Sequence, residues 1–175
     1  MILTGPEITD AARDGRIDIS PFRADQVNPN SYNVTLGRTL IVYTDEIVDA
    51  NTVNPTSLIS IGDEGYVLQP EQLYLGHTME RVGSDTFVPL LFGRSSVGRL
   101  GLFVEITAPI GDIGFHGQWT LMLSPVRPLR VYPGMKIGQI MFFVCHGTID
   151  LYRGKYQDSV GPQESRHWQD RASRA

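Results

Sequence analysis

The stretch GRSSVGRLGLFVEITAPIGDIGFHGQWTLMLSPVRPLRVYPGMKIGQIMF, residues 93–142, decides the fold class of this chain. Short apolar runs alternate in it with glycine and proline, which is the pattern of β-strands joined by tight turns. The same pattern continues on both sides, since the 175 residues include 18 glycines and 11 prolines. The sequence therefore predicts an all-β domain.

Nine segments carry the aliphatic, aromatic and β-branched residues typical of strands. They are SYNVTLG (31–37), TLIVY (39–43), YVLQ (66–69), LYLGHTME (73–80), FVPLLFG (87–93), LFVEITA (102–108), QWTLMLS (118–124), LRVYP (129–133) and KIGQIMFFVC (136–145). A short helix is expected near the N-terminus, where Thr4 or Pro6 opens PEITDAARDG and Gly15 ends it.

Two of the strand segments, VPLLF (88–92) and IMFFV (140–144), are continuously apolar. A strand with one face in water alternates apolar and polar residues, so these runs predict burial on both faces. In a chain of this length, we expect part of that burial to come from other subunits.

The composition is that of an ordinary globular protein, with 41% hydrophobic and 19% charged residues, and the length suits one domain. The formal net charge of -4 gives no basic surface for a nucleic-acid polymer. The single cysteine, Cys145, excludes an internal disulfide and a multi-cysteine zinc site. The opening MILTGPEITDAARDG does not read as a signal peptide, and no segment approaches membrane-spanning length. We expect a cytoplasmic protein that does not bind membranes.

The heptad GRSSVGR (93–99) combines two arginines, two serines and two glycines. Glycine lets a phosphate approach the backbone, the hydroxyls donate hydrogen bonds, and Arg94 and Arg99 offer forked cationic donors. The heptad thus predicts a phosphate site, although a solvated turn with incidental charges would have the same composition.

A second segment, PIGDIGFHGQ (109–118), places Asp112 between glycines in a tight turn. Aspartate in such a turn is usually a turn former. The functional alternative is a carboxylate that orients or deprotonates water, with Phe115 packed on a sugar face where it would exclude a 2′-hydroxyl.

The order RSSxxR, then an Asp-containing turn ending in G-[FWY]-x-G, then PGMKIGQIMF, resembles the dCTP deaminase/dUTPase superfamily. GRIDISPF and VNPNSYNVTLG near the start, and GKYQDSVGPQESR near the end, are similar to its deaminase branch. The resemblance implies a distorted jelly-roll-like β fold, a homotrimer with active sites between subunits, a pyrimidine deoxynucleoside triphosphate as ligand, and Mg²⁺ carried on the triphosphate.

The resemblance also implies roles for individual residues. The triphosphate-binding positions fall on Arg94, Ser95, Ser96, Arg99 and Gln139, with Tyr152 and Lys155 as approximate matches in the tail. Asp112 falls on the aspartate shared by both branches, which in dUTPases activates the water that attacks the α-phosphate. The sugar and base pocket is expected at Ala108, Phe115, Thr120, Leu121 and Met122, and no residue is expected to ligate a metal directly. The chain would then divide into a β domain (1–151) and a tail (152–175) that closes over the nucleotide, where composition alone equally allows a disordered terminus.

The chain departs from the family pattern at the proton-transfer step. The deaminases place a glutamate ten residues beyond the hairpin aspartate, and here that position is Met122. A thioether cannot exchange the required proton. Glu105 precedes the hairpin on a different predicted strand, and nothing in the sequence indicates that it substitutes. Two lesser departures are Asn33, where an acid is usual, and Ser159, where a nucleotide-contacting glutamine is expected.

Three hypotheses follow. The first is a pyrophosphohydrolase that converts dUTP, dCTP or a modified analogue to the monophosphate, with Asp112 orienting the water and deamination lost. The alternative is a dCTP deaminase that forms dUTP in spite of Met122. The third is a catalytically silent, nucleotide-binding regulatory trimer.

Overall fold

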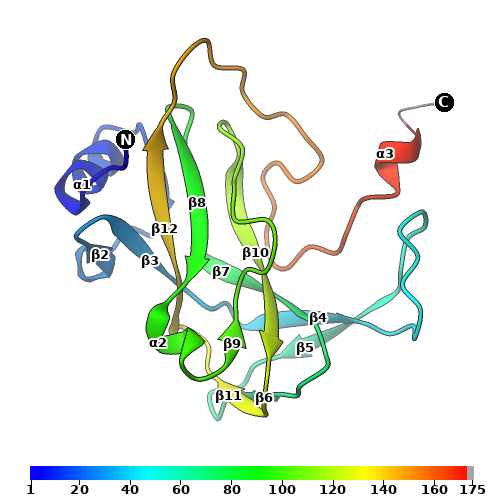
Figure 1. Ribbon diagram of the computed structural model, residues 1–175. Helices are drawn as coiled ribbons and strands as arrows, with labels where there is room; N and C mark the ends of the chain where they lie inside the picture. The colour runs from blue at the N-terminus through cyan, green and yellow to red at the C-terminus, as the bar shows by residue number, and fades with distance from the viewer. Residues whose placement is uncertain (173–175) are drawn as a thin grey trace.

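The computed structural model of the protein describes residues 1–172, and almost all of its regular structure is antiparallel β-sheet (Figure 1). The elements in chain order are α1 (Gly5–Arg13), β1 (Asp18–Ser20), a 3-10 turn (Ala24–Gln26), β2 (Val27–Asn28), β3 (Ser31–Thr35), β4 (Thr39–Tyr43), β5 (Thr56–Ser60), β6 (Tyr66–Leu68), β7 (Tyr74–Gly83), β8 (Phe87–Gly93), α2 (Ser95–Gly98), β9 (Leu102–Phe103), β10 (His116–Pro125), β11 (Leu129–Val131), β12 (Lys136–Val144) and α3 (Gln169–Ala172). The prediction of an all-β fold with one short N-terminal helix is confirmed, apart from two further four-residue helices.

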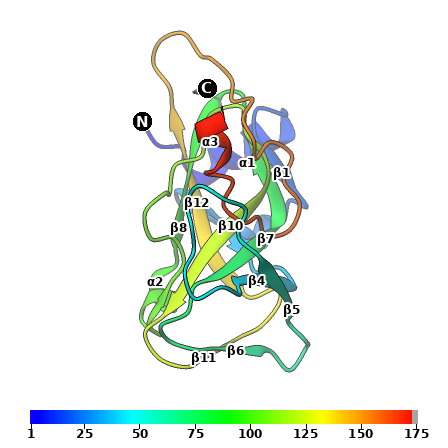
Figure 2. The same cartoon turned by 90° about the vertical axis from the view of Figure 1, so that its right-hand side faces the viewer.

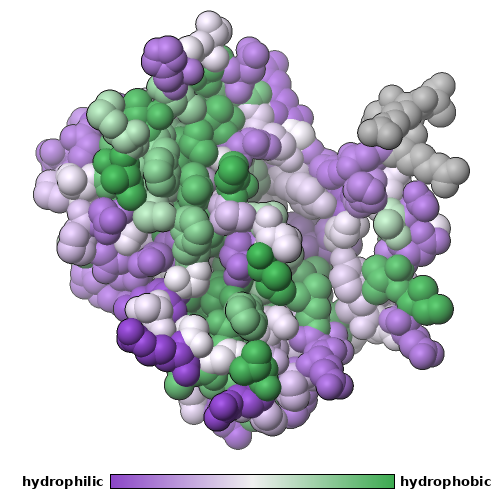
Figure 3. Space-filling view, in the orientation of Figure 1, coloured by the Kyte–Doolittle hydropathy of each residue, from purple (hydrophilic) through white to green (hydrophobic). Residues whose placement is uncertain are grey.

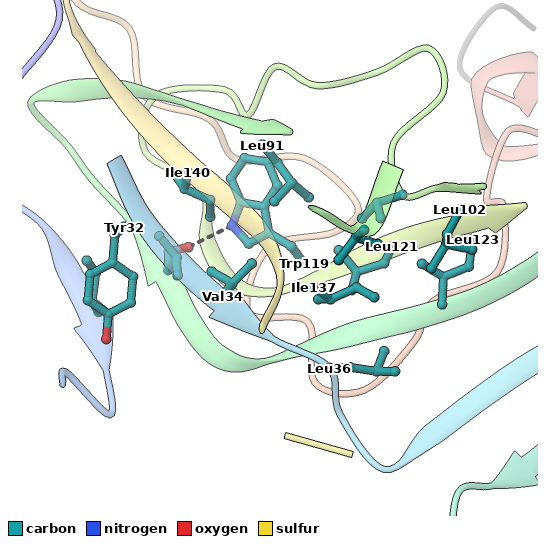
Figure 4. Close-up of a cluster of buried hydrophobic side chains, with 14 of the residues drawn as sticks. Tyr32, Val34, Leu36, Leu91, Leu102, Trp119, Leu121, Leu123, Ile137 and Ile140 are labelled. Carbon is teal, nitrogen blue, oxygen red and sulfur yellow. Dashed lines mark hydrogen bonds between the residues drawn. The ribbon is translucent and has the colours of Figure 1, made fainter. Parts of the chain in front are cut away.

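The strands form two main sheets and one small one. The larger sheet has the order β5-β4-β7-β10-β9, with β1 pairing on β7. The second sheet has the order β2-β3-β12-β8, and β11 pairs with β6. The core lies between the facing sheets, where Leu121 and Leu123 of β10 meet Leu91 of β8 and Ile140 of β12 (Figure 4). Burial of each such side chain contributes roughly 1.5–3 kcal/mol, so this contact holds β10 rigidly against the second sheet.

The N-terminal helix α1 begins and ends where the sequence predicts. Thr4 is its N-cap and Pro6 lies in its first turn, while Gly15 adopts a φ of 77° just beyond its end. Ile8 and Ala11 are fully buried on the inner face of the helix, which fixes α1 against the sheet.

Two segments differ from their predicted structure. The expected strand 102–108 pairs only over Leu102–Phe103, after which the chain leaves β10 as a loop. The loop turns back to β8, because Pro109 accepts a hydrogen bond from Leu91 N (2.8 Å) and Gly111 N donates one to Pro89 O (2.9 Å). In the heptad 93–99, the serines open the helical turn α2, which is anchored by the buried Val97.

The apolar runs in β8 and β12 pair with each other from Gly138↔Gly93 to Val144↔Phe87. Within one chain, burial on both faces is not found. Leu91, Ile140 and Phe142 face the core, whereas the alternate residues of both strands remain partly exposed. Figure 3 shows the resulting apolar surface over β8 and β12. The residues of this apolar face are Ile2, Val88, Leu90, Phe92, Met141 and Phe143.

Among the described residues, none of the helices has the length and apolar character needed to cross a membrane.

Candidate active site

A pocket of about 480 Å³ opens beside the strand β10. Its walls come from three parts of the chain: β10 with its neighbours β7 and β4, the loop 105–112, and the C-terminal tail. The residues that line it are Tyr43, Leu73, Leu75, Glu105, Ala108, Ile110, Gly111, Asp112, Phe115, Gln118, Trp119, Thr120, Met122, Tyr152, Tyr156, Ser159, Gln163, Glu164 and Ser165. The size suits a small-molecule ligand such as a nucleoside.

The strand β10 presents alternate residues to the pocket and to the core. Its side chains are partly and fully buried in strict alternation, so Gln118, Thr120 and Met122 share the pocket face. Leu121 belongs to the other face and is 0% exposed. We expected Leu121 in the sugar and base pocket. The two-residue period of the strand instead puts its side chain in the core, where it supports the pocket from behind.

Asp112 lies in the loop before β10, in a turn that backbone groups close without the Asp112 carboxylate. Phe115 N donates to the backbone carbonyl of Asp112 at 3.0 Å, and Gly114 takes a φ of 90° to complete the turn. A side-chain turn former would accept a hydrogen bond from the backbone N–H two residues on, but Gly114 N donates to Ser84 O at 2.8 Å instead. The exposed carboxylate of Asp112, which lines the pocket, is therefore available to a ligand or to water.

Aromatic rings form the wall next to Asp112. Phe115 packs edge-on against Trp119, with ring centroids 5.7 Å apart, and against Tyr152 at 6.0 Å. Trp119 is fixed in turn by a hydrogen bond from its indole N–H to Val82 O (3.1 Å), shown dashed in Figure 4. These contacts hold Phe115 in a single orientation facing the pocket.

The tail runs along the edge of β10 (Figures 1 and 2), and several of its residues line one side of the pocket. Its backbone pairs with the strand, because Asp158 N donates to His116 O and Gln118 N donates to Ser159 O, both at 2.9 Å. Further along, Gln163 N donates to Thr120 Oγ1 at 3.0 Å. Tyr152, Tyr156 and the segment 163–165 thereby become pocket walls.

An ion-pair network fixes the same part of the tail to the larger sheet. Arg81 of β7 bonds Asp158 of the tail at 2.7 Å and Asp18 of β1 at 2.9 Å. His116 contacts Asp18 at 3.3 Å and Asp85 at 3.0 Å. Asp158 has a φ of 59°, so the tail turns sharply at the point where Arg81 holds it.

Glu105 is a pocket residue that sequence reasoning missed. It lies in the loop directly after β9, and its side chain lines the same pocket as Asp112 and Met122. Burial raises the pKa of Glu105 to about 7, against the smaller opposing effect of hydrogen bonds from the backbone of Ala108 and Ile106. From the sequence, nothing indicated that Glu105 could substitute for the missing glutamate, because it precedes the hairpin on another predicted strand; the structure places it in the pocket.

The expected triphosphate-binding residues lie outside this pocket. Arg94 caps α2, which contains Ser95 and Ser96, and its guanidinium donates to Lys136 O at 3.5 Å. Gln139 lies on the neighbouring strand β12, where its Oε1 accepts from Ser31 Oγ at 3.4 Å. The structure thus gathers Arg94, Ser95, Ser96, Arg99 and Gln139 around the junction of β8, α2 and β12. We call this group the phosphate motif.

The other expected residues divide between the pocket and its surroundings. Ala108, Asp112, Phe115, Thr120, Met122 and Tyr152 line the pocket. Lys155 lies in the tail but pairs with Asp170 at 2.6 Å. Asn33 is buried in β3, where its Nδ2 donates to Gln26 O (3.0 Å) and Asn28 Oδ1 (3.1 Å). The change at Asn33 therefore leaves the pocket itself unaltered.

The described residues contain no group of three or more His, Cys, Asp or Glu side chains that could hold a metal ion. The pocket accordingly offers carboxylates, aromatic rings and backbone groups rather than a metal cage.

The chain belongs to the dCTP deaminase/dUTPase superfamily of enzymes. The solved structure of a 2′-deoxycytidine 5′-triphosphate deaminase from Agrobacterium tumefaciens superposes with a TM-score of 0.66 and 21% identity, over 85% of this chain and 50% of that one. The chain thus spans half the length of the Agrobacterium protein, and the likeness shows the fold.

Within this superfamily, the chain belongs to the dCTP deaminase-like family, whose model matches residues 2–145. Proteins named dCTP deaminase, dUMP-forming, are similar to it over nearly their whole length. The one from Clostridium beijerinckii is 48% identical over 97% of this chain and 98% of its own. Those from Leptospira biflexa and Cytophaga hutchinsonii are 46% identical with the same coverage.

These relatives overturn the leading functional expectation. The leading hypothesis, a pyrophosphohydrolase that has lost deamination because of Met122, is wrong. Relatives of this similarity are named for both deamination and dUMP formation. The alternative, deamination of dCTP, agrees better with them, with dUMP rather than dUTP as the named product. The inference rested on the single strand position of Met122, and the structure adds a second acid, Glu105, to the lining of the same pocket.

Proposed function

We propose that the protein converts dCTP to dUMP, with release of ammonia and pyrophosphate. The conversion requires two hydrolytic reactions on one nucleotide: replacement of the 4-amino group of cytosine by oxygen, and attack of water on the α-phosphorus. The observation that carries the proposal is the presence of two carboxyl groups of different character, Asp112 and Glu105, in one pocket of nucleoside size. The names of the relatives supply the substrate class.

We assign the phosphorus chemistry to Asp112. Its carboxylate is exposed in the pocket and is not consumed in forming its turn, so it can orient a water molecule and take a proton from it. Phe115 and Tyr152 would flank the sugar, and the ring of Phe115 would exclude a 2′-hydroxyl. Ala108 and Thr120 complete the wall on the base side.

The triphosphate would be bound by the phosphate motif of a neighbouring subunit. Arg94 and Arg99 supply cationic donors, and Ser95, Ser96 and Gln139 supply neutral ones. The family resemblance implies that Mg²⁺ would be carried on the triphosphate of the substrate, where it would supply positive charge to stabilise the leaving pyrophosphate.

Sharing of the site between subunits agrees with the apolar face on β8 and β12. These two strands lead directly into the phosphate motif, and Phe92 of the apolar face is 37% exposed. A contiguous apolar surface of this kind is typical of a subunit interface. We propose a homotrimer, and light scattering should give a mass near three times 19.5 kDa.

The proposal is tested by incubating the purified protein with dCTP and Mg²⁺ and resolving nucleotides, ammonia and pyrophosphate. We expect dUMP, ammonia and pyrophosphate in equal amounts. Accumulation of dUTP with no pyrophosphate would show a deaminase alone, and dCMP without ammonia would show a hydrolase alone. Binding of dCTP without any product would show a silent binder. Each of these three results would contradict the proposed function.

A further inference from the structure

Deamination of cytosine needs a group that Met122 cannot supply. Water that attacks C4 must lose a proton, N3 must gain one, and the departing amine must gain another. A single carboxyl group commonly performs these transfers in turn, since it can both accept and donate a proton. The thioether of Met122 does neither. If the proposed function holds, another residue of the pocket must carry the protons.

The strand register brings Glu105 to the side of Met122. The short strand β9 pairs with β10 through Pro125↔Leu102 and Ser124↔Phe103. Continuing the same antiparallel register by two residues would put Glu105 directly opposite Met122. The chain leaves the β9–β10 pairing after Phe103. The side chains of Glu105 and Met122 nevertheless line the same pocket.

The burial of neighbouring residues also groups Glu105 with Met122. Val104 is buried in the core, whereas the next residue, Glu105, is partly exposed and lines the pocket. On β10 the same division holds between Leu121, in the core, and Met122, in the pocket. Glu105, two residues beyond β9, and Met122 of β10 therefore line the same pocket.

The surroundings of Glu105 suit a group that both takes and gives a proton. Its side chain is partly buried, and its carboxyl group accepts backbone hydrogen bonds from Ala108 N, at 3.4 Å to Oε1, and from Ile106. The raised pKa of about 7 leaves comparable amounts of acid and carboxylate at neutral pH. The exposed Asp112 lies on the other side of the same loop and is assigned to the phosphorus.

We propose that Glu105 is the proton-transfer residue of deamination and takes the part that a glutamate at position 122 would otherwise play. The inference rests on the proposed function. The Glu105 carboxylate accepts a proton from water as the oxygen bonds to C4, and passes it to N3 as the C4–N3 double bond opens. It then takes the proton of the new hydroxyl and gives it to the amine. The C4–N4 bond breaks, ammonia leaves, a carbonyl forms at C4, and Glu105 returns to its carboxylate form.

The first test compares Glu105→Gln with Glu46→Gln, a matched change at an exposed loop residue outside the pocket. Ammonia release from dCTP is measured beside pyrophosphate release from dUTP, which needs no deamination. We expect Glu105→Gln to lower ammonia release about 10²-fold or more, with pyrophosphate release from dUTP within about threefold of wild type. The variant Glu46→Gln should change neither rate.

Two further measurements keep the inference testable if Glu105→Gln is poorly active throughout. In the wild type, kcat/KM for ammonia release should rise with pH through about 7, because the carboxylate is the form that accepts the first proton. Adding Met122→Glu to Glu105→Gln should restore ammonia release by at least tenfold.

The outcomes separate the two proposals. Absence of ammonia release by the wild type would overturn the proposed function itself. Ammonia release by the wild type that Glu105→Gln leaves within about threefold would overturn the role of Glu105 alone. A loss produced by Glu164→Gln instead, the remaining acid of the pocket, would also overturn it and move the role to the tail.

Discussion

The pocket beside β10 is enclosed by a single chain, whereas the phosphate motif around α2 is open. The pocket is complete within one chain, since the loop 105–112, the strand and the tail are bound together by backbone hydrogen bonds. The phosphate motif is an open, polar junction at the end of an apolar face that the single chain leaves uncovered. Under the proposed function, the base and sugar would therefore be bound by a single chain, whereas binding of the triphosphate would require a neighbouring subunit.

Mixing two inactive variants tests this contrast most severely. Asp112→Asn removes the carboxylate from the pocket, and Arg94→Gln removes a cation from the phosphate motif. If each site combines a pocket with a neighbour's motif, trimers refolded from an equal mixture should contain about a quarter intact sites, and dUMP formation should rise from near zero to that fraction. Failure of the mixture to exceed either variant, with mixed trimers demonstrated by mass, would place both parts of the site in the same chain.

The Asp112→Asn variant by itself separates the two reactions proposed for the pocket, pyrophosphate release and ammonia release. Asparagine keeps the size of the side chain but loses the base, so we expect pyrophosphate release to fall about 10²-fold or more with nucleotide affinity largely kept. Ammonia release should continue, and dUTP should replace dUMP as the product. Chromatography of the products measures both rates, and unchanged pyrophosphate release would leave Asp112 as a structural turn residue.

Removal of the tail tests whether the pocket needs its third wall. Deletion of 152–175 exposes the edge of β10 that Asp158 and Ser159 cover, but leaves the core and the apolar face intact. We expect a folded trimer with activity lowered about tenfold or more, because water would reach the bound nucleotide. Full activity after the deletion would exclude a closing role.

Protease sensitivity examines the same tail in the intact protein. We expect cleavage after Arg153 or Lys155 in the free protein, and protection by a non-hydrolysable pyrimidine deoxynucleotide with Mg²⁺. Equal cleavage with and without the nucleotide would show that ligand binding does not order this segment.

The smallest expected effect concerns the tie between the tail and the sheet. Arg81→Met keeps the length of the side chain and removes its ion pairs with Asp158 and Asp18. Such partly exposed pairs contribute up to about 1 kcal/mol each, so KM for dCTP should rise about two- to fivefold with little change in kcat. Arg38→Met, which breaks an exposed pair with Asp63, is the matched control. An identical response of both variants would show that the Arg81 network does not position the tail.

The sequence by itself determined the class of fold and much of the pocket. Alternation of apolar runs with glycine and proline is a local property, so the strands and the helix 6–15 could be predicted from it. The motif order around Asp112 and Phe115 was likewise sufficient to indicate the family. The short strands β1, β2 and β5 escaped prediction because their residues show little apolar alternation; β5 is largely exposed.

Tertiary structure alone decided which residues share the pocket. Leu121 and Met122 are neighbours in sequence, yet the period of the strand sends one to the core and the other to the ligand. Glu105 reaches the pocket because β9 pairs with β10 in one particular register and then leaves it after Phe103. A register is fixed by packing against the whole core rather than by the residues of the strand itself, so the second carboxyl group of the site could not be read from the sequence.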